Sequence, residues 1–269
     1  MILACAFVVG YAFVEARQAS TQPATTQSAT KPVTPSLPPV LDAAAGAGGA
    51  AGAGRPAEVG VNREAQTTSL PAPKESCDDL KVLVDRSHTL PPDYAPDDLV
   101  TLSEHKVPTL GSAEMLLRRE AAGHLRRLVK AAAADGEELV VASAYRSYAY
   151  QQTSYARLTS IYGTDADLMS ARPGHSQHQL GTAVDFTNAA ASFEIWDYFG
   201  DTSAYWWLRD HAREHGFVLA YPRSKEAETG YQWEPWHYRY VGARNVERLE
   251  ESGLSLQEFL AREGVLARC

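Results

Sequence analysis

The uneven placement of aromatic residues is the feature of this sequence that most restricts how the chain can fold. No aromatic residue occurs between Phe13 and Tyr94, so the first quarter of the chain has few large side chains with which to build a core. Residues 17–76 are rich in Ala, Gly, Pro, Thr, Ser and Gln. Such a segment buries too little apolar surface to offset its chain entropy, and we expect a disordered linker there. The fold must therefore lie in residues 77–269.

The amino terminus begins with a short apolar run from Ile2 to Val14. A membrane-spanning helix needs about 20 apolar residues, so this run fits the core of a signal peptide better. The basic residues that usually precede such a core are missing. We expect residues 1–16 to be a signal peptide, with an uncleaved membrane anchor as the alternative. Either reading predicts export to the cell envelope or the extracellular space.

Charge and cysteine content bound the partners and the compartment. The formal net charge is −8 and the pI is about 5.5, and no run of Lys or Arg could follow a phosphate backbone, so we expect no nucleic-acid partner. We expect a monomer that touches a membrane only through an uncleaved anchor. Cys77 and Cys269 stand at the two ends of the candidate domain. An oxidising compartment would allow a disulfide between them, while two free thiols fit the sequence equally well.

Hydrophobic periodicity predicts a mixed fold of helices and strands. Apolar residues at three- and four-residue steps from Leu117 to Ala132 indicate an amphipathic helix that Ser112 could cap and Gly136 could end. Further helices are expected at 147–162, 202–216, 243–251 and 255–263, and strands at 138–143, 181–186, 217–222 and 236–241. The elements do not alternate regularly, and no repeat is visible. This predicts an α+β fold with a small sheet flanked by helices.

Three residues of metal-ligand type stand in or beside the expected strands. Zinc hydrolases need three nitrogen or oxygen ligands, an open position for water and a nearby carboxylate base. His178, Asp185 and His237 could supply the ligands, and Gly181 would let the chain turn close to the metal. Glu234, three residues before His237, could reach the water without binding the metal. The combined spacing S-x-H-x-x-G-x-A-x-D at 176–185 with E-P-W-H at 234–237 is more specific than any one residue.

Two other histidine pairs compete for the metal. His175 and His178 form H-x-x-H, and His211 and His215 are one helical turn apart. We interpret His211 and His215 as solvated helix residues and His175 as a residue at the lip of the cleft.

The sequence resembles the zinc D,D-carboxypeptidases of the VanY type, within the wider group that includes lysostaphin-like peptidases and the hedgehog signalling domain. The matching segments are SAYRSYAYQ (143–151), RPGHSQHQLGTAVDF (172–186) and GYQWEPWHYRYVG (230–242). The resemblance covers about residues 79–250, and Trp233 and Gln177 depart from the family pattern. It implies one zinc ion held by His178, Asp185 and His237, a small antiparallel sheet carrying an open zinc cleft, and Glu234 as the catalytic base.

The resemblance also implies roles for four further residues. Arg146 would polarise the scissile carbonyl or hold the terminal carboxylate of the substrate, and a guanidinium fork suits either task better than Lys. Gln151 and Ser176 would line the site, and Tyr231 would form a wall of the cleft. The alternatives are a surface ion pair for Arg146, a solvent-facing amide for Gln151, a turn cap for Ser176 and simple packing for Tyr231.

The function that the resemblance implies is removal of the terminal D-alanine from peptidoglycan stem peptides. An L,D-carboxypeptidase or a D,D-dipeptidase would use the same ligands, although the proline of EPWH favours a carboxypeptidase. A non-catalytic zinc module that binds the cell wall is the alternative of another class, and the presence of Glu234 argues against it.

Overall fold

A four-stranded antiparallel sheet lies at the centre of the computed structural model, which describes residues 74–269. Its strands run in the order β4-β5-β7-β6, with bounds β4 (Val140–Ser143), β5 (Ala183–Thr187), β7 (His237–Tyr240) and β6 (Phe217–Leu219). Two strand pairs lie outside this sheet. They are the parallel pair β1 (Lys74–Glu75) and β8 (Val265–Leu266) and the antiparallel pair β2 (Leu99–Thr101) and β3 (Leu116–Arg118). The α+β class expected from the sequence is confirmed.

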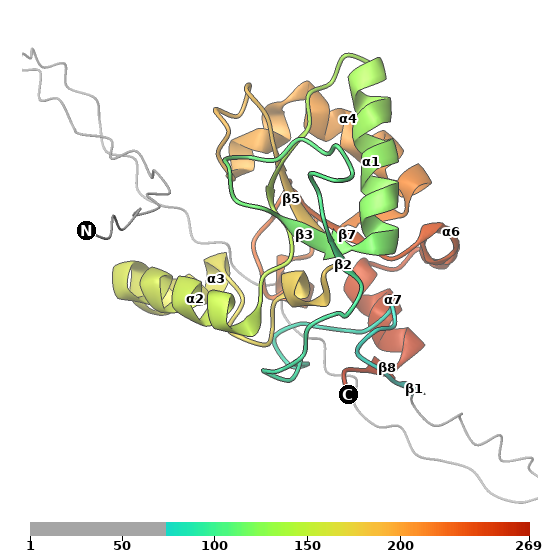
Figure 1. Cartoon of the computed structure of the whole chain (residues 1–269). Helices are drawn as coiled ribbons and strands as arrows, with labels where there is room; N and C mark the ends of the chain where they lie inside the picture. The colour runs from blue at the N-terminus through green and yellow to red at the C-terminus, as the bar shows by residue number, and fades with distance from the viewer. Residues whose placement is uncertain (1–73) are drawn as a thin grey trace, which may run out of the picture. The chain divides into compact units, whose positions relative to one another are not determined.

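Two helices, α1 (Arg119–Ala134) and α4 (Ser203–His211), pack together on one face of the central sheet (Figure 1). Side chains two residues apart on a strand share a face. Phe186 and Tyr238 therefore point into a core with Leu125 and Leu208 of the helices, and all four side chains are buried. This packing leaves the intervening residues Asp185 and His237 on the opposite face.

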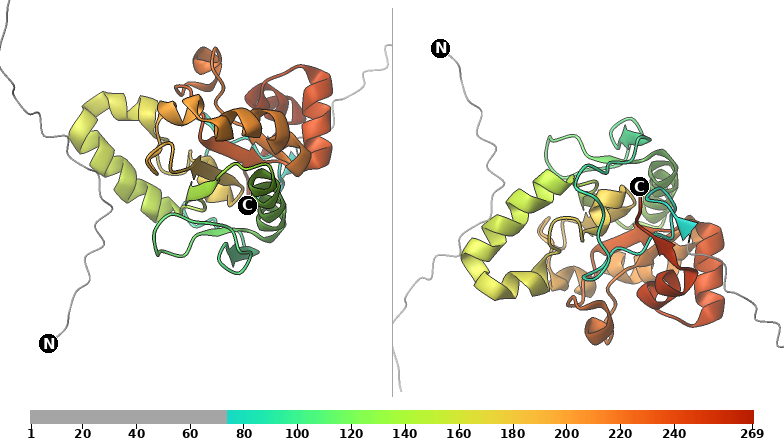
Figure 2. Two further views of the ribbon diagram at one scale, coloured as in Figure 1. Left: turned by 90° about the horizontal axis from the view of Figure 1, so that it is seen from above. Right: turned by 90° about the horizontal axis from the view of Figure 1, so that it is seen from below.

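The remaining helices surround the sheet. Helices α6 (Ala243–Ser252) and α7 (Leu256–Glu263) pack against Val218 and Val241 in a second apolar cluster. The long helix α2 (Tyr148–Tyr162) and the short α3 (Ala166–Met169) form an arm at the side of the molecule (Figure 2). The short helical turns are η1 (Gly163–Asp165), η2 (Gln177–Leu180), η3 (Asp197–Asp201), η4 (Ala212–His215) and α5 (Glu226–Thr229).

The predicted start of the first long helix is wrong. Leu117, expected in that helix, lies in β3, and α1 begins only at Arg119, with no side-chain cap. Ser112 therefore does not cap it. The reason is the pairing of β3 with β2, in which Val100 lies opposite Leu117.

A disulfide joins the two ends of the folded unit. Cys77 and Cys269 are bonded, with their Cα atoms 5.6 Å apart, and strands β1 and β8 pair beside them. The sequence allowed either a disulfide or two free thiols here, and the structure contains the disulfide. Lys74–Glu75 already forms a strand, slightly before the expected domain boundary at Cys77. The predicted signal segment 1–16 and nearly all of the predicted linker lie outside the described residues.

In the described part of the chain, we find no helix with the length and apolar character needed to cross a membrane.

Candidate metal centre

The site is built on one row of residues that crosses three strands of the sheet. Ser143 on β4 lies opposite Asp185 on β5, and Asp185 lies opposite His237 on β7. Directly opposed residues in an antiparallel sheet have Cβ atoms about 4.5–5.5 Å apart, so the register alone brings the carboxylate and the imidazole together. The Asp185 Oδ1 and His237 Nδ1 atoms are 2.9 Å apart.

His178 reaches this row from the turn η2, just before β5. The Ser176 hydroxyl accepts a hydrogen bond from the His178 backbone N–H at 3.3 Å. Gly181 ends the turn at φ +64°, a left-handed conformation that favours glycine. A Cβ at Gly181 would also lie only 2.9 Å from Leu99 Cδ2. Cap and glycine together fix the short turn that presents the His178 ring to Asp185.

In each histidine, one ring nitrogen is hydrogen-bonded to a neighbouring oxygen and carries the proton. The other ring nitrogen is then available to bind a metal. His178 Nδ1 is 2.6 Å from the Ala144 carbonyl oxygen, which can only accept, so Nδ1 carries the proton and Nε2 has a free lone pair. His237 Nε2 is 3.2 Å from Gln177 Oε1. With Nε2 donating to that amide oxygen, His237 Nδ1 has the free lone pair that faces Asp185.

The available ring nitrogens of the two histidines and the Asp185 carboxylate form a buried set of acceptors that fits a divalent metal. His178 Nε2 is 3.2 Å from Asp185 Oδ2, yet it has no hydrogen-bond partner among the described residues. Ligand atoms of His178, Asp185 and His237 all lie within 4.8 Å of one another, and this is the one group of three such residues found in the described part of the chain. Two imidazoles and one carboxylate are a ligand set typical of catalytic zinc.

Burial and the charges of neighbouring residues shift the pKa values of His178 and Asp185. Burial, together with the Arg146 charge, lowers the pKa of His178 to about 4, so the ring is neutral at pH 7, as a ligand must be. Burial alone would raise the pKa of Asp185, but His178 and His237 hold it below its ordinary value. The site therefore presents the negative charge of Asp185 beside a neutral His178.

Glu234 lies beside this set without belonging to it. Its Oε2 is 3.8 Å from His237 Nδ1, and its side chain is 11% exposed. Its backbone N–H donates to the Tyr221 carbonyl oxygen at 3.1 Å. Burial, followed by the negative charge of Asp185, raises the pKa of Glu234 well above its ordinary value, while Arg146 opposes this shift. A carboxyl group with a raised pKa is suited to exchanging protons near neutral pH.

Arg146 extends the row from its β4 side. Its Nη1 is 3.1 Å from Ser143 Oγ and 3.6 Å from Asp185 Oδ2. Its backbone N–H donates to the His178 carbonyl oxygen at 3.3 Å. The side chain is 26% exposed, so the guanidinium can still meet a ligand. Arg146 does form an ion pair, as its alternative proposed, but its partner is the buried Asp185 and not a surface carboxylate.

The three other predicted residues occupy different surroundings. Gln151 is buried and its amide nitrogen donates to the Ala171 carbonyl oxygen at 2.6 Å, so it does not face solvent. Ser176 caps η2, as its alternative reading proposed. Tyr231 is buried with Arg86 stacked 4.8 Å above its ring, and it lines a small cavity of about 250 Å³ together with Arg86, Asp167, Ser170, Arg172 and His175.

The competing histidines do not join the cluster. His211 stacks on Trp207 and lies 3.3 Å from Glu214. His175 Nδ1 lies 2.7 Å from the Asp85 carbonyl oxygen. Neither these residues nor His215 belongs to the three-residue group, within residues 74–269.

Two residues that support His237 were not predicted. The side-chain oxygen of Gln177 accepts a hydrogen bond from His237 Nε2. The sequence had marked Gln177 only as a departure from the family pattern. Tyr221 packs its ring 5.0 Å from the His237 ring. The position of Gln177 next to His178 was a usable signal, whereas nothing local identified Tyr221.

Comparisons with known proteins identify relatives of this chain. A family model described as "VanY: D-alanyl-D-alanine carboxypeptidase" matches residues 114–243. YodJ of Bacillus subtilis (strain 168) is 35% identical over 191 residues, which cover 69% of this chain and 68% of YodJ. A D-alanyl-D-alanine carboxypeptidase of Enterococcus faecalis is 31% identical over 217 residues, which cover 76% of this chain and 75% of the relative.

Solved structures show the same fold. The LdcB LD-carboxypeptidase aligns with a TM-score of 0.64 at 33% identity, over 73% of this chain and 92% of LdcB. A variant of the D,D-pentapeptidase VanY from a VanB-type resistance cassette, in complex with Zn(II), aligns with a TM-score of 0.55 at 31% identity. That alignment covers 69% of this chain and 99% of the VanY chain.

Proposed function

The chain belongs to the VanY family of D-alanyl-D-alanine carboxypeptidases, and we propose that it is a zinc-dependent carboxypeptidase that removes the terminal D-alanine from peptidoglycan stem peptides. The observation that carries this proposal is the convergence of His178, Asp185 and His237 on one point, with Glu234 beside them. The Zn(II) complex of a VanY relative supports zinc as the metal.

The metal position takes one zinc ion per domain, held by His178 Nε2, an Asp185 carboxylate oxygen and His237 Nδ1. When bound, zinc supplies Lewis-acid polarisation and lowers the pKa of a coordinated water to about 7. The Ala144 carbonyl and the Gln177 amide hold the two imidazoles in the tautomers that this binding needs.

Glu234 is the proton carrier. It takes a proton from the attacking water as the new C–O bond forms, and it then passes that proton to the nitrogen of the departing D-alanine as the peptide C–N bond breaks. Its buried position keeps bulk water from competing for that proton. Arg146 lies where it can donate to the developing oxyanion or to the terminal carboxylate of the substrate. Of the other residues suggested by the sequence, Gln151 holds the Ala171 carbonyl, Ser176 caps η2, and Tyr231 lines a small cavity with Arg86 and His175.

Replacing the proposed base tests the mechanism. Glu234→Gln keeps the size of the side chain but removes the proton acceptor, so we expect zinc content to be retained and turnover of a stem pentapeptide to fall by a factor of about 100 or more. Product formation is followed by mass spectrometry, and bound metal by elemental analysis. Turnover close to that of the unaltered enzyme would overturn the assignment. Full zinc with no hydrolysis of any stem peptide by the unaltered chain would favour the non-catalytic wall-binding module.

The preferred stem length separates the proposed activity from its alternatives. The similarity to the LdcB LD-carboxypeptidase favours L,D-carboxypeptidase activity as the second candidate, and a relative from Enterococcus gallinarum combines D-Ala-D-Ala dipeptidase and carboxypeptidase activities. Pentapeptide, tetrapeptide and dipeptide substrates assayed side by side distinguish the three. We expect loss of one D-alanine from the pentapeptide to be fastest.

A cell-wall substrate requires an envelope or extracellular location. This location agrees with the apolar run at residues 2–14 as an export signal or anchor and with residues 17–76 as a spacer between that segment and the catalytic domain. Fractionation of cells that make the full chain tests it, with the domain expected outside the cytoplasmic membrane.

A further inference from the structure

A buried glycine of the turn η3, Gly200, lies against the two residues that flank Glu234. A Cβ added at Gly200 would lie 2.5 Å from Trp233 Cζ2 and closer still to Trp233 Cη2, and it would lie 3.2 Å from Pro235 Cβ. Such approaches are far shorter than the contacts of a packed protein interior. Only the absence of a side chain at Gly200 therefore lets both neighbours of Glu234 pack against this stretch of backbone.

Space, and not backbone conformation, is the reason for a glycine here. The φ angle of Gly200 lies outside the left-handed region, so a residue with a side chain could adopt the same backbone. The turn itself is anchored on both sides of the glycine. Phe199 is buried in the main core, and the Thr202 hydroxyl accepts a hydrogen bond from the Tyr205 N–H at the start of α4. Gly200 thus belongs to a fixed support.

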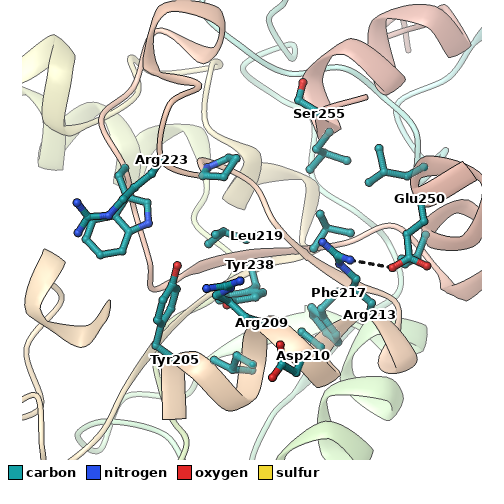
Figure 3. Close-up of a pocket in the computed structure, with 18 of the residues that line it drawn as sticks. Tyr205, Arg209, Asp210, Arg213, Phe217, Leu219, Arg223, Tyr238, Glu250 and Ser255 are labelled. Atoms are coloured by element: carbon teal, nitrogen blue, oxygen red, sulfur yellow. Dashed lines mark hydrogen bonds and ion pairs between the residues drawn. The ribbon is translucent and has the colours of Figure 1, made fainter. Parts of the chain in front are cut away.

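The Trp233 indole is held against this support by two further groups. The Tyr205 ring meets it edge to face, with the ring centroids 5.8 Å apart at an interplanar angle of 82°. The Arg223 guanidinium lies 3.6 Å from the centroid of the indole. These residues border a cavity of about 840 Å³, and Figure 3 shows Tyr205 and Arg223 at the same end of it. A side chain added at Gly200 would therefore push the indole against neighbours that already hold it.

The position of the Glu234 carboxylate depends on its backbone. Within residues 74–269, no group donates a hydrogen bond to this carboxylate. The main chain of Glu234 is held instead, because its N–H donates to the Tyr221 carbonyl oxygen and its carbonyl oxygen accepts from the His237 N–H, both at 3.1 Å. A displacement of a catalytic group by about 1 Å can lower the rate by a factor of about 100. The packing of residues 233 and 235 therefore bears directly on catalysis.

We propose that Gly200 is a positioning residue for the hydrolysis. Its bare backbone supports Trp233 and Pro235, and these two residues fix the main chain of Glu234 so that the carboxylate lies beside the metal position. Gly200 itself touches neither the metal ligands nor the substrate. This inference rests on the proposed role of Glu234 as the proton carrier.

The test compares Gly200→Ala with the unaltered full chain, both loaded with zinc. The added methyl group should displace Trp233 and Pro235 and move Glu234 with them, while pairing with β5 and β6 keeps His237 in place. We expect kcat for the stem pentapeptide to fall by a factor of about 10 to 100. KM should change by less than about twofold, and the variant should keep about one zinc per chain.

Gly123→Ala is the matched control, because a Cβ at Gly123 in α1 meets nothing within 4 Å. It should leave kcat unchanged. Trp233→Phe removes Cζ2 and Cη2, the indole atoms that a Cβ at Gly200 would meet. Combining Gly200→Ala with Trp233→Phe should therefore raise kcat about threefold or more above that of Gly200→Ala alone. Rates are compared per zinc-loaded chain at a temperature where circular dichroism shows every variant folded.

Trp233→Ala decides the question if Gly200→Ala does not fold. It leaves Gly200 intact and removes the side chain that packs there, so kcat should fall by about tenfold with zinc retained. The proposal is overturned if either single variant keeps the kcat of the unaltered chain, if the double variant is no faster than Gly200→Ala, or if lost activity follows lost zinc. An unaltered chain that hydrolyses no stem peptide would overturn the peptidase proposal itself, and this inference with it.

Discussion

Three side chains around the metal position are each held by a hydrogen bond to a neighbouring group. The Ala144 carbonyl fixes His178, the Gln177 amide fixes His237, and the Ser143 hydroxyl lies at the guanidinium of Arg146. Such supporting contacts hold a site within the narrow tolerance that catalysis requires. Arg146 is the member of this set whose two proposed tasks can be separated by kinetics.

Arg146→Lys keeps the positive charge but removes the two-pronged donor geometry. We expect kcat/KM for the stem pentapeptide to fall by a factor of about 100, the scale found when one oxyanion donor is lost. A fall confined to kcat assigns Arg146 to the developing oxyanion, and a rise in KM alone assigns it to the terminal carboxylate. Unchanged steady-state constants would contradict both tasks.

At this scale the sequence selected side chains that the fold brings together, but not the atoms that each of them presents. Residue type and spacing were enough to select His178, Asp185, His237 and Glu234. The ring nitrogen that each histidine offers depends on partners such as the Ala144 carbonyl. No pattern in the sequence reports such a partner, because it comes from the register of three strands and the path of one loop.

Among the elements, the turn η2 decides whether His178 meets the strand that carries Asp185. Gly181→Ala would place a Cβ in a left-handed conformation and 3.0 Å from Arg118 Cγ. A non-glycine residue in that conformation costs about 1–2 kcal/mol, and the contact should add to this. We expect a lower free energy of unfolding in urea and weaker zinc binding.

Gly253→Ala is the matched control for that substitution. Gly253 has nearly the same backbone angle, φ +65°, at the end of α6, but a Cβ there meets nothing within 4 Å. It should lose only the conformational part of the stability and should bind zinc normally. Equal effects at both positions would show that the turn does not control the metal site.

The sequence predicted the elements that local residue patterns determine. It missed a helix boundary that depends on pairing with a strand distant in the sequence. The strands expected at 181–186 and 236–241 correspond to β5 and β7, whose apolar, β-branched and aromatic residues favour a strand locally, and both strands are buried throughout. The start of α1 was misplaced because Leu116–Arg118 pairs with β2. A helical pattern compares only residues a few positions apart, so it cannot report pairing with a distant strand.

Considered as a whole, the folded unit is closed on itself by the Cys77–Cys269 disulfide. These residues are 192 positions apart, and a bond that closes so long a loop restricts the unfolded chain strongly. Cys77→Ser together with Cys269→Ser should lower the free energy of unfolding by about 2–5 kcal/mol. The measurement is urea unfolding of the zinc-loaded protein, and the unaltered protein should lose the same stability on reduction.

Catalysis should survive loss of that bond at temperatures where the variant stays folded, because neither cysteine lies in the metal cluster. An equal stability for the disulfide-free variant would contradict the constraint inferred here. The pairing could not be decided from the sequence, since two cysteines at the ends of a domain reveal neither their distance in space nor their redox state.

Zinc stoichiometry of the purified chain tests the central claim most directly. We expect about one zinc per chain in the unaltered protein and almost none in His178→Ala, Asp185→Ala or His237→Ala, each checked for its fold by circular dichroism. Removing the metal with a chelator should abolish hydrolysis, and adding zinc should restore it. Full zinc content in any one of these folded variants, or hydrolysis that persists without metal, would contradict the account.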